Sequence, residues 1–218
     1  PNYFGSNTNH RYRELVPPSC TRLLGPDYAL LSPEYSWMHS FLPPRTELKR
    51  ILVYFGGADL FNVSSKVISI LSSHEFKLLA IDVVIGSQSE HQQEVRQLAD
   101  KRPHTNVYSN IQTLAGLIAR ADLCIGAGGS TTWERACLGL PTITIPIAEN
   151  QVLPSTILSA EIDSPLLQAD FLDSDLTEKV LTFMKSPESL SALSLRLSQL
   201  LDGSGISKLL NTITSSND

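Results

Sequence analysis

Short apolar runs alternate with helix-forming segments along most of the chain, and this alternation constrains the fold more than any other feature. The segments predicted as strands are ILVYF, LLAIDVVIG, the shorter NVYSN, DLCIG and TITIPI. In the segment VSSKVISILSS, which follows the first run, Val63, Val67 and Ile70 share one helical face. Continuous apolar runs are typical of parallel strands, because both faces of a parallel sheet are covered. The pattern predicts an α/β fold, a Rossmann-like parallel sheet with helices on both faces.

Residues 1–44 differ in composition from the rest of the chain. The polar and proline-rich pieces SNTNH, VPPS and FLPP surround one compact motif, GPDYALLSPEY. Pro43 and Pro44 cannot continue a regular element, so we expect a linker to end there. Beyond Asp163, the segments SDLTEKVLTFMK and PESLSALSLRLSQLL have the spacing of amphipathic helices. We therefore expect a single domain over residues 45–218, which ends in a helical tail.

The composition excludes several functional classes. The chain has 218 residues and a net charge of −5, without the basic stripe that a nucleic-acid-binding protein needs. No apolar run approaches the roughly 20 residues that span a bilayer. The histidines are scattered without metal-ligand spacing, so we expect no bound metal. Cys20, Cys124 and Cys137 form no C-x-x-C pair, and we expect Cys124 and Cys137 to be buried thiols. A cytoplasmic protein fits these features.

Two glycine-rich turns, FGGADLFN and GAGGSTTWE, follow predicted strands. Ligands of open α/β sheets bind outside the carboxyl ends of the strands, where such turns lie. Neither turn has the spacing G-x-G-x-x-G or the Walker spacing G-x-x-x-x-G-K-[ST]. A nicotinamide dehydrogenase and a P-loop NTPase are therefore disfavoured. Taken singly, each turn is equally well explained as a tight turn that serves packing.

The second turn carries more chemistry than the first. Gly128 and Gly129 would let a diphosphate approach the backbone, and Ser130 and Thr131 offer hydroxyls and the N–H groups of a helix start. Glu134 lies four residues after Ser130, so both project from one helix face. A carboxylate one turn from a phosphate site can accept hydrogen bonds from a ribose diol. The alternative is a solvated glutamate favoured near a helix N-terminus.

Asn150 and Gln151 follow the run TITIPI and are predicted on the same rim of the sheet. Their amides can donate to phosphate or sugar oxygens and accept from hydroxyls. Asn150 could instead serve only as the cap of the next helix.

The segments GPDYALLSPEY, ILVYFGGAD and ADLCIGAGGSTTWERACLGLPTITIPIAENQ, in this order, closely resemble PseG-type enzymes. These are the UDP-2,4-diacetamido-2,4,6-trideoxy-β-L-altropyranose hydrolases of pseudaminic acid biosynthesis, related to MurG-like glycosyltransferases. The resemblance covers most of residues 20–160. It implies a GT-B architecture of two Rossmann-like domains, of which the C-terminal one holds UDP. It also implies a hydrolase that releases UDP and a free amino-deoxy sugar without a cofactor or metal.

The resemblance assigns roles to the matching residues. It places the diphosphate on the glycine loop and the ribose on the helix glutamate, with uracil near the VYSN segment and the sugar beside the ENQ motif. The implied UDP-binding residues are Gly128, Gly129, Ser130, Thr131, Glu134 and Tyr108; Gly56, Gly57 and Gln151 would line the substrate cleft, and Asn150 would assist catalysis.

One departure from the family pattern is large. The catalytic histidine of PseG-type enzymes lies in a G-x-G-H-x-x-R loop of the N-terminal domain, and this chain has no such motif. We therefore expect residues 1–44 to be the end of a missing N-terminal domain with the interdomain linker. Such a fragment would bind UDP and hydrolyse a UDP-sugar very poorly.

Three alternatives remain open at the level of sequence. A GT-B glycosyltransferase would use the same UDP site, because fold and nucleotide motif do not distinguish transfer from hydrolysis. A non-catalytic sugar-nucleotide-binding module would bind UDP without turnover. A structural Rossmann-like domain would bind no ligand at all.

Overall fold

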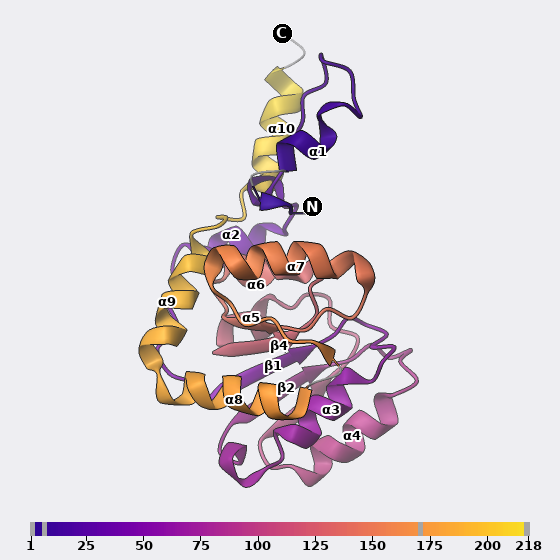
Figure 1. Cartoon of the computed structure of the whole chain (residues 1–218), viewed down its shortest axis with the longest axis vertical. Coiled ribbons are helices and arrows are strands. Elements are labelled where there is room, and N and C mark those ends of the chain that lie inside the picture. The colour runs from indigo at the N-terminus through magenta and orange to yellow at the C-terminus, as the bar shows by residue number, and fades with distance from the viewer. Residues whose placement is uncertain (1–2, 6–7, 170–171, 216–218) are drawn as a thin grey trace.

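A computed structural model of the chain describes residues 3–5, 8–169 and 172–215, and its centre is a parallel sheet (Figure 1). The strands run in the order β3-β2-β1-β4-β5. Every apolar run predicted as a strand forms one, so the predicted α/β fold is confirmed. β5 is shorter than its run TITIPI because proline cannot donate to a strand ladder, and Pro146 lies two residues beyond its end. The strands are β1 (Arg50–Tyr54), β2 (Ala80–Val84), β3 (Thr105–Tyr108), β4 (Leu123–Gly126) and β5 (Thr142–Thr144).

Helices cover both faces of the sheet, as Figure 1 shows. One layer contains α3 (Val63–Ile70), α4 (Gln92–Lys101) and α8 (Leu172–Lys185), which contact one another through α3. The other contains α5 (Ala115–Arg120) and α6 (Thr131–Cys137). The remaining long helices follow β5: α7 (Glu149–Ile162) and α9 (Pro187–Ser198) pack against each other, and α9 also contacts α6 and α8.

The segment before the sheet packs against the Rossmann-like domain. It forms α1 (Thr8–Arg13), the 3₁₀ turn η2 (Pro26–Tyr28) and α2 (Pro33–His39), which the sequence pattern does not predict. α2 contacts α5 and α6, while η2 contacts the last helix, α10 (Gly205–Ser215). This last contact is close, since a Cβ atom at Gly205 would lie 2.2 Å from the carbonyl oxygen of Ala29.

The core surrounds the sheet and contains the two thiols predicted to be buried, Cys124 and Cys137. Asp59 and Asp82 are buried carboxylates, and Asp82, which lies on β2, is fully paired. Arg50 and Arg120 bond to it at 3.1 and 2.8 Å, and the Asn106 amide donates to it at 3.2 Å. Buried charges are tolerated when paired and hydrogen-bonded in this way, so the cluster has a structural role.

Arg45 anchors the segment before β1 to the ends of α5 and α6. Its side chain is 7% exposed, and its guanidinium donates to the carbonyl oxygens of Ala121, Leu138 and Ile118 at 3.1, 2.6 and 3.0 Å. These carbonyls lie at the C-terminal ends of α5 and α6, where a helix leaves acceptors without partners and a cation is favourable. Burial lowers the pKa of Arg45. Its lost hydration is replaced by these hydrogen bonds.

Replacing Arg45 with methionine is therefore expected to destabilise the fold. Methionine fills part of the space but leaves buried carbonyls without a donor, which costs about 2 kcal/mol. The midpoint of thermal unfolding should fall by about 6 °C. Arg96→Met, which removes an exposed arginine bonded to Ser109, should change the free energy of unfolding by less than about 0.5 kcal/mol. Equal midpoints for the two variants would contradict this role of Arg45.

Among the described residues, no helix combines the length and apolar character that crossing a membrane requires.

Candidate functional site

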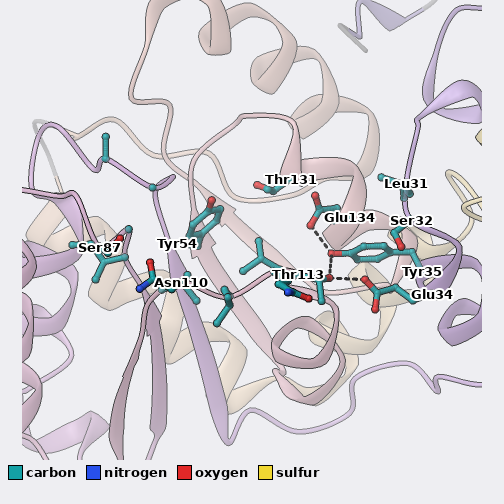
Figure 2. A pocket seen from close by; sticks show the side chains of 18 of the residues that line it. Leu31, Ser32, Glu34, Tyr35, Tyr54, Ser87, Asn110, Thr113, Thr131 and Glu134 are labelled. Carbon is teal, nitrogen blue, oxygen red and sulfur yellow. Dashed lines mark hydrogen bonds between the residues drawn. The ribbon is translucent and has the colours of Figure 1, made fainter.

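A cavity of about 860 Å³ opens at the carboxyl ends of β1 and β2, beside the loop that follows β3 and the start of α6. This is where the strand order reverses, since β1 lies between β2 and β4, and open α/β sheets bind ligands at such a point. Its volume falls in the range of ligand pockets, about 300–1,000 Å³. Figure 2 shows the labelled side chains around it, with Ser87, Asn110 and Tyr54 toward one end and Tyr35 and Glu34 toward the other.

Two glycines bring the loops after β1 and β2 together at the cavity. The N–H of Gly86 donates to the carbonyl oxygen of Gly57 at 2.9 Å. A Cβ atom at Gly86 would lie 2.3 Å from that oxygen, so a side chain there would push the two backbones apart. The neighbouring Gly56 has a φ of +85°, a left-handed conformation that favours glycine. The close approach of the two backbones therefore requires a glycine at position 86 rather than at position 57.

Glu134 lies at the cavity, where α6 presents it one turn from Thr131. The hydroxyl of Tyr35, from α2, donates to its Oε2 atom at 2.6 Å. Beside this pair the Thr113 hydroxyl donates to Glu34 Oε1, also at 2.6 Å, as the dashed lines in Figure 2 show. Burial, followed by the hydrogen bond to Glu134, raises the pKa of Tyr35 far above its ordinary value. Tyr35 is therefore a neutral donor at physiological pH.

The glycine loop before α6 is held from one side by Gln151. The Gln151 Oε1 atom accepts from the N–H groups of Gly128 at 3.2 Å and Ile147 at 3.1 Å. The amide thereby joins the loop to the end of β5, which gives Gln151 a structural role. The N–H groups of Gly129, Ser130 and Thr131 have no acceptor among the residues that the structure describes. They are therefore available to an anion, whereas the N–H of Gly128 is not.

A buried cation, Arg135, lies against the same loop. Its side chain is 2% exposed, and one guanidinium nitrogen donates to the Ala127 carbonyl oxygen at 2.7 Å and to the Thr132 hydroxyl at 3.1 Å. Its Nε atom is buried without a partner, and no carboxylate of the described chain pairs with it. An uncompensated buried cation is costly, so this arrangement favours an anion at the loop.

A smaller cavity of about 180 Å³ lies on the other part of the glycine loop. Gly128, Gly129 and Ser130 line it together with Asn150 and Gln151. Asn150 is the second residue of α7, and its side chain is exposed at the rim. Of the described residues, no lysine or arginine lines either cavity, so positive potential at the loop comes from N–H groups and Arg135.

The structure divides the sequence-predicted residues among three places. Gly57, Thr131 and Glu134 line the larger cavity. The smaller cavity is lined by the predicted residues Gly128, Gly129, Ser130, Asn150 and Gln151. Gly56 and Tyr108 line neither. The Tyr108 hydroxyl instead accepts from Arg120 at 2.6 Å, on the face of the sheet that carries the buried Asp82. Its chain neighbours Asn110 and Ile111 do reach the larger cavity.

Sequence reasoning missed the polar residues that hold Glu134 and the loop. Tyr35 and Glu34 belong to the GPDYALLSPEY motif, to which the sequence pattern assigns no role at the site. Thr113 and Arg135 carry no local signal, because only the fold brings Thr113 toward α2 and turns Arg135 under the loop.

Residues 51–200 match the sequence profile of the glycosyltransferase family 28 C-terminal domain. The chain belongs to this family. Among curated relatives of this family 28 domain, the spore coat polysaccharide biosynthesis protein SpsG of Bacillus subtilis is 31% identical over 128 residues. The match covers 58% of this chain and 38% of SpsG. The UDP-N-acetylglucosamine–N-acetylmuramyl-(pentapeptide) pyrophosphoryl-undecaprenol N-acetylglucosamine transferase of Rippkaea orientalis is 32% identical, over 46% of this chain and 30% of the transferase.

The family 28 domain also resembles solved structures. Acinetobacter baumannii MurG superposes with a TM-score of 0.64 at 17% identity, over 84% of this chain and 54% of that one. The UDP-GlcNAc 2-epimerase of Neisseria meningitidis, solved with UDP-GlcNAc bound, has a TM-score of 0.58 at 12% identity, over 84% and 48% of the two chains. The fold is thus that of the C-terminal half of a GT-B protein. The chain spans less than half the length of the curated relatives that it matches.

Proposed function

We propose that this chain is the UDP-sugar-binding half of a GT-B glycosyltransferase of polysaccharide synthesis. The observation that carries the proposal is the grouping of an anion site and a diol acceptor on one short helix. The free N–H groups of residues 129–131 lie over the buried cation Arg135, and the Glu134 carboxylate follows one turn later. The family and the names of its relatives, a polysaccharide biosynthesis protein and a UDP-sugar-dependent transferase, support the same function.

In the proposed complex the UDP lies along the start of α6. The diphosphate would accept hydrogen bonds from the loop N–H groups and the Thr131 hydroxyl. The two ribose hydroxyls would donate to Glu134, and uracil would lie in the larger cavity beside Asn110 and Ile111. The sugar would extend past the loop toward the smaller cavity, where Asn150 can bond its hydroxyl or amide groups.

The proposed reaction breaks the bond between the anomeric carbon and the oxygen of the β-phosphate. An acceptor hydroxyl oxygen forms the new bond to that carbon, its proton passes to a general base, and the bonding electron pair leaves with UDP. The loop N–H groups and Arg135 would stabilise the charge that grows on the leaving diphosphate. We propose that the base and the acceptor site belong to a second Rossmann-like domain.

Hydrolysis, with water in place of the acceptor hydroxyl, is a second candidate. The resemblance of GPDYALLSPEY and AENQ to PseG-type hydrolases favours it, and so does the exposed position of Asn150, which would orient the water. A non-catalytic sugar-nucleotide-binding module would share the UDP site but not the turnover.

The first test is a calorimetric titration of this chain with UDP. Saturable 1:1 binding is expected, and no binding of UDP at millimolar concentration would refute the proposed function. UDP-sugars are then incubated with the protein extended by its second domain, with and without a polysaccharide acceptor. Release of UDP only with acceptor supports transfer, release without acceptor supports hydrolysis, and binding without release supports a module.

A further inference from the structure

Tyr35 is a buried tyrosine that takes no part in the proposed reaction. Its side chain is 3% exposed and comes from α2, which precedes the sheet in the chain. Its hydroxyl nevertheless reaches the cavity and donates to Glu134 Oε2. In the part of the chain that the structure describes, no other hydrogen bond to that carboxylate is present. Figure 2 shows the hydroxyl directed at the carboxylate.

The proton positions follow from the neighbouring bonds. The Thr113 hydroxyl has one proton, which it donates to Glu34, and its oxygen accepts from the N–H of Ala115 at 3.1 Å. The Tyr35 oxygen lies 3.5 Å from the Thr113 oxygen, at the outer limit of a hydrogen bond. The proton of Tyr35 is therefore committed to Glu134, at the short distance typical of a bond to an ionised acceptor.

We propose that Tyr35 is a positioning residue that fixes the Glu134 carboxylate in the orientation required to accept the ribose diol of a UDP-sugar. This inference rests on the proposed function. An ionised carboxylate has about four acceptor positions, of which Tyr35 uses one. Two ribose hydroxyls can still each find an oxygen. A glutamate that is held before the ligand arrives loses less rotamer entropy on binding than a free one.

The support for Tyr35 is itself rigid. The neighbouring Glu34 accepts from Thr113, which lies just before α5, while Tyr35 bonds to α6. α2 therefore joins the loop before α5 to the helix that carries Glu134. Ribose recognition then depends on a segment that lies outside the sheet and its own loops.

The test compares UDP with 2′,3′-dideoxy-UDP, which lacks both ribose hydroxyls. Tyr35→Phe keeps the packed ring and removes only the hydroxyl. We expect this variant to bind UDP about tenfold more weakly than the wild-type chain, because an unheld glutamate must lose its rotamer freedom when the ligand binds. Its affinity for the dideoxy ligand, measured by displacement, should be unchanged. Tyr28→Phe makes the same chemical change in a tyrosine of this segment that does not line the cavity, and should alter neither affinity.

The dideoxy ligand separates positioning from packing. If Tyr35→Phe lowers the affinity for UDP and for the dideoxy ligand by the same factor, Tyr35 only supports the fold and the inference is wrong. It is equally wrong if the variant binds UDP as the wild type does. In a Glu134→Ala background, Tyr35→Phe should have no further effect on UDP, and an added loss would overturn the proposal. Failure of the wild-type chain to bind UDP would instead refute the proposed function, and with it this inference.

Discussion

Glu134→Ala is expected to weaken UDP binding about 100-fold, because two hydrogen bonds from the ribose to a charged acceptor are lost together. The fold should survive, since Glu134 is half-buried at the cavity and, among the residues that the structure describes, its carboxylate bonds only to the Tyr35 hydroxyl. That hydroxyl can turn to water that enters the vacated space. The measurement is calorimetric titration with UDP, together with the midpoint of thermal unfolding, which should fall by no more than about 4 °C.

The matched control for this variant is Glu178→Ala. Glu178 is exposed on α8, pairs with its neighbour Lys179 and lines neither cavity. The Glu178→Ala substitution removes the same charge as Glu134→Ala and should leave the UDP affinity unchanged. If both variants weaken UDP equally, the effect is one of net charge, and the carboxylate of Glu134 has no specific part in binding. If Glu134→Ala binds UDP as tightly as the wild-type chain, the ribose does not bind at Glu134.

Gly86→Ala is expected to have the largest effect on stability. Its Cβ atom would lie 2.3 Å from the Gly57 carbonyl oxygen and 2.9 Å from the carbonyl carbon, both of them backbone atoms. The loop after β1 must therefore move, which breaks the Gly86 to Gly57 hydrogen bond and opens the cavity. We expect a loss of about 4 kcal/mol in the free energy of unfolding, or about 12 °C in the midpoint, and a loss of measurable UDP binding.

Gly57→Ala is the control for backbone crowding. A Cβ atom at Gly57 would meet nothing within 4 Å, and its φ is outside the left-handed region. Its unfolding midpoint should stay within about 2 °C of the wild type. Denaturation curves of the two variants therefore distinguish the general effect of replacing a glycine by alanine from the effect of crowding where the two backbones approach closely. Equal stability of Gly86→Ala and Gly57→Ala would show that the two loops can separate without cost.

The sheet is the part of this protein that its sequence predicts best. The central strands β1 and β4 contain continuous apolar runs that end near glycine, and burial on both faces of the sheet favours such runs. The glycine loop and Glu134 are also visible, because a short segment contains the whole arrangement. Helix ends are predicted less well: α5 begins at Ala115, four residues after the start of its pattern at Ile111.

Contacts between distant segments are the part that the sequence does not predict. Tyr35 and Glu134 are 99 residues apart, and nothing in either neighbourhood points to the other. Gln151 lies in a motif that suggests a ligand contact, yet its amide holds the N–H of Gly128, 23 residues away. Tyr108 lies in the predicted segment and shares a sheet face with its register partner Val84, which lines the cavity, but its hydroxyl bonds to Arg120 instead. Such pairings depend on the assembled fold rather than on local spacing.

The wall of the cavity formed by Leu30, Leu31 and the start of α2 lies outside residues 51–200, which match the family 28 profile. The sequence of this wall can therefore change independently of the sequence of the sheet. A lineage can keep the strands and the glycine loop while exchanging the segment that forms this wall of the cavity. Ligand preference among such proteins can then diverge without any change in the residues that match the family profile.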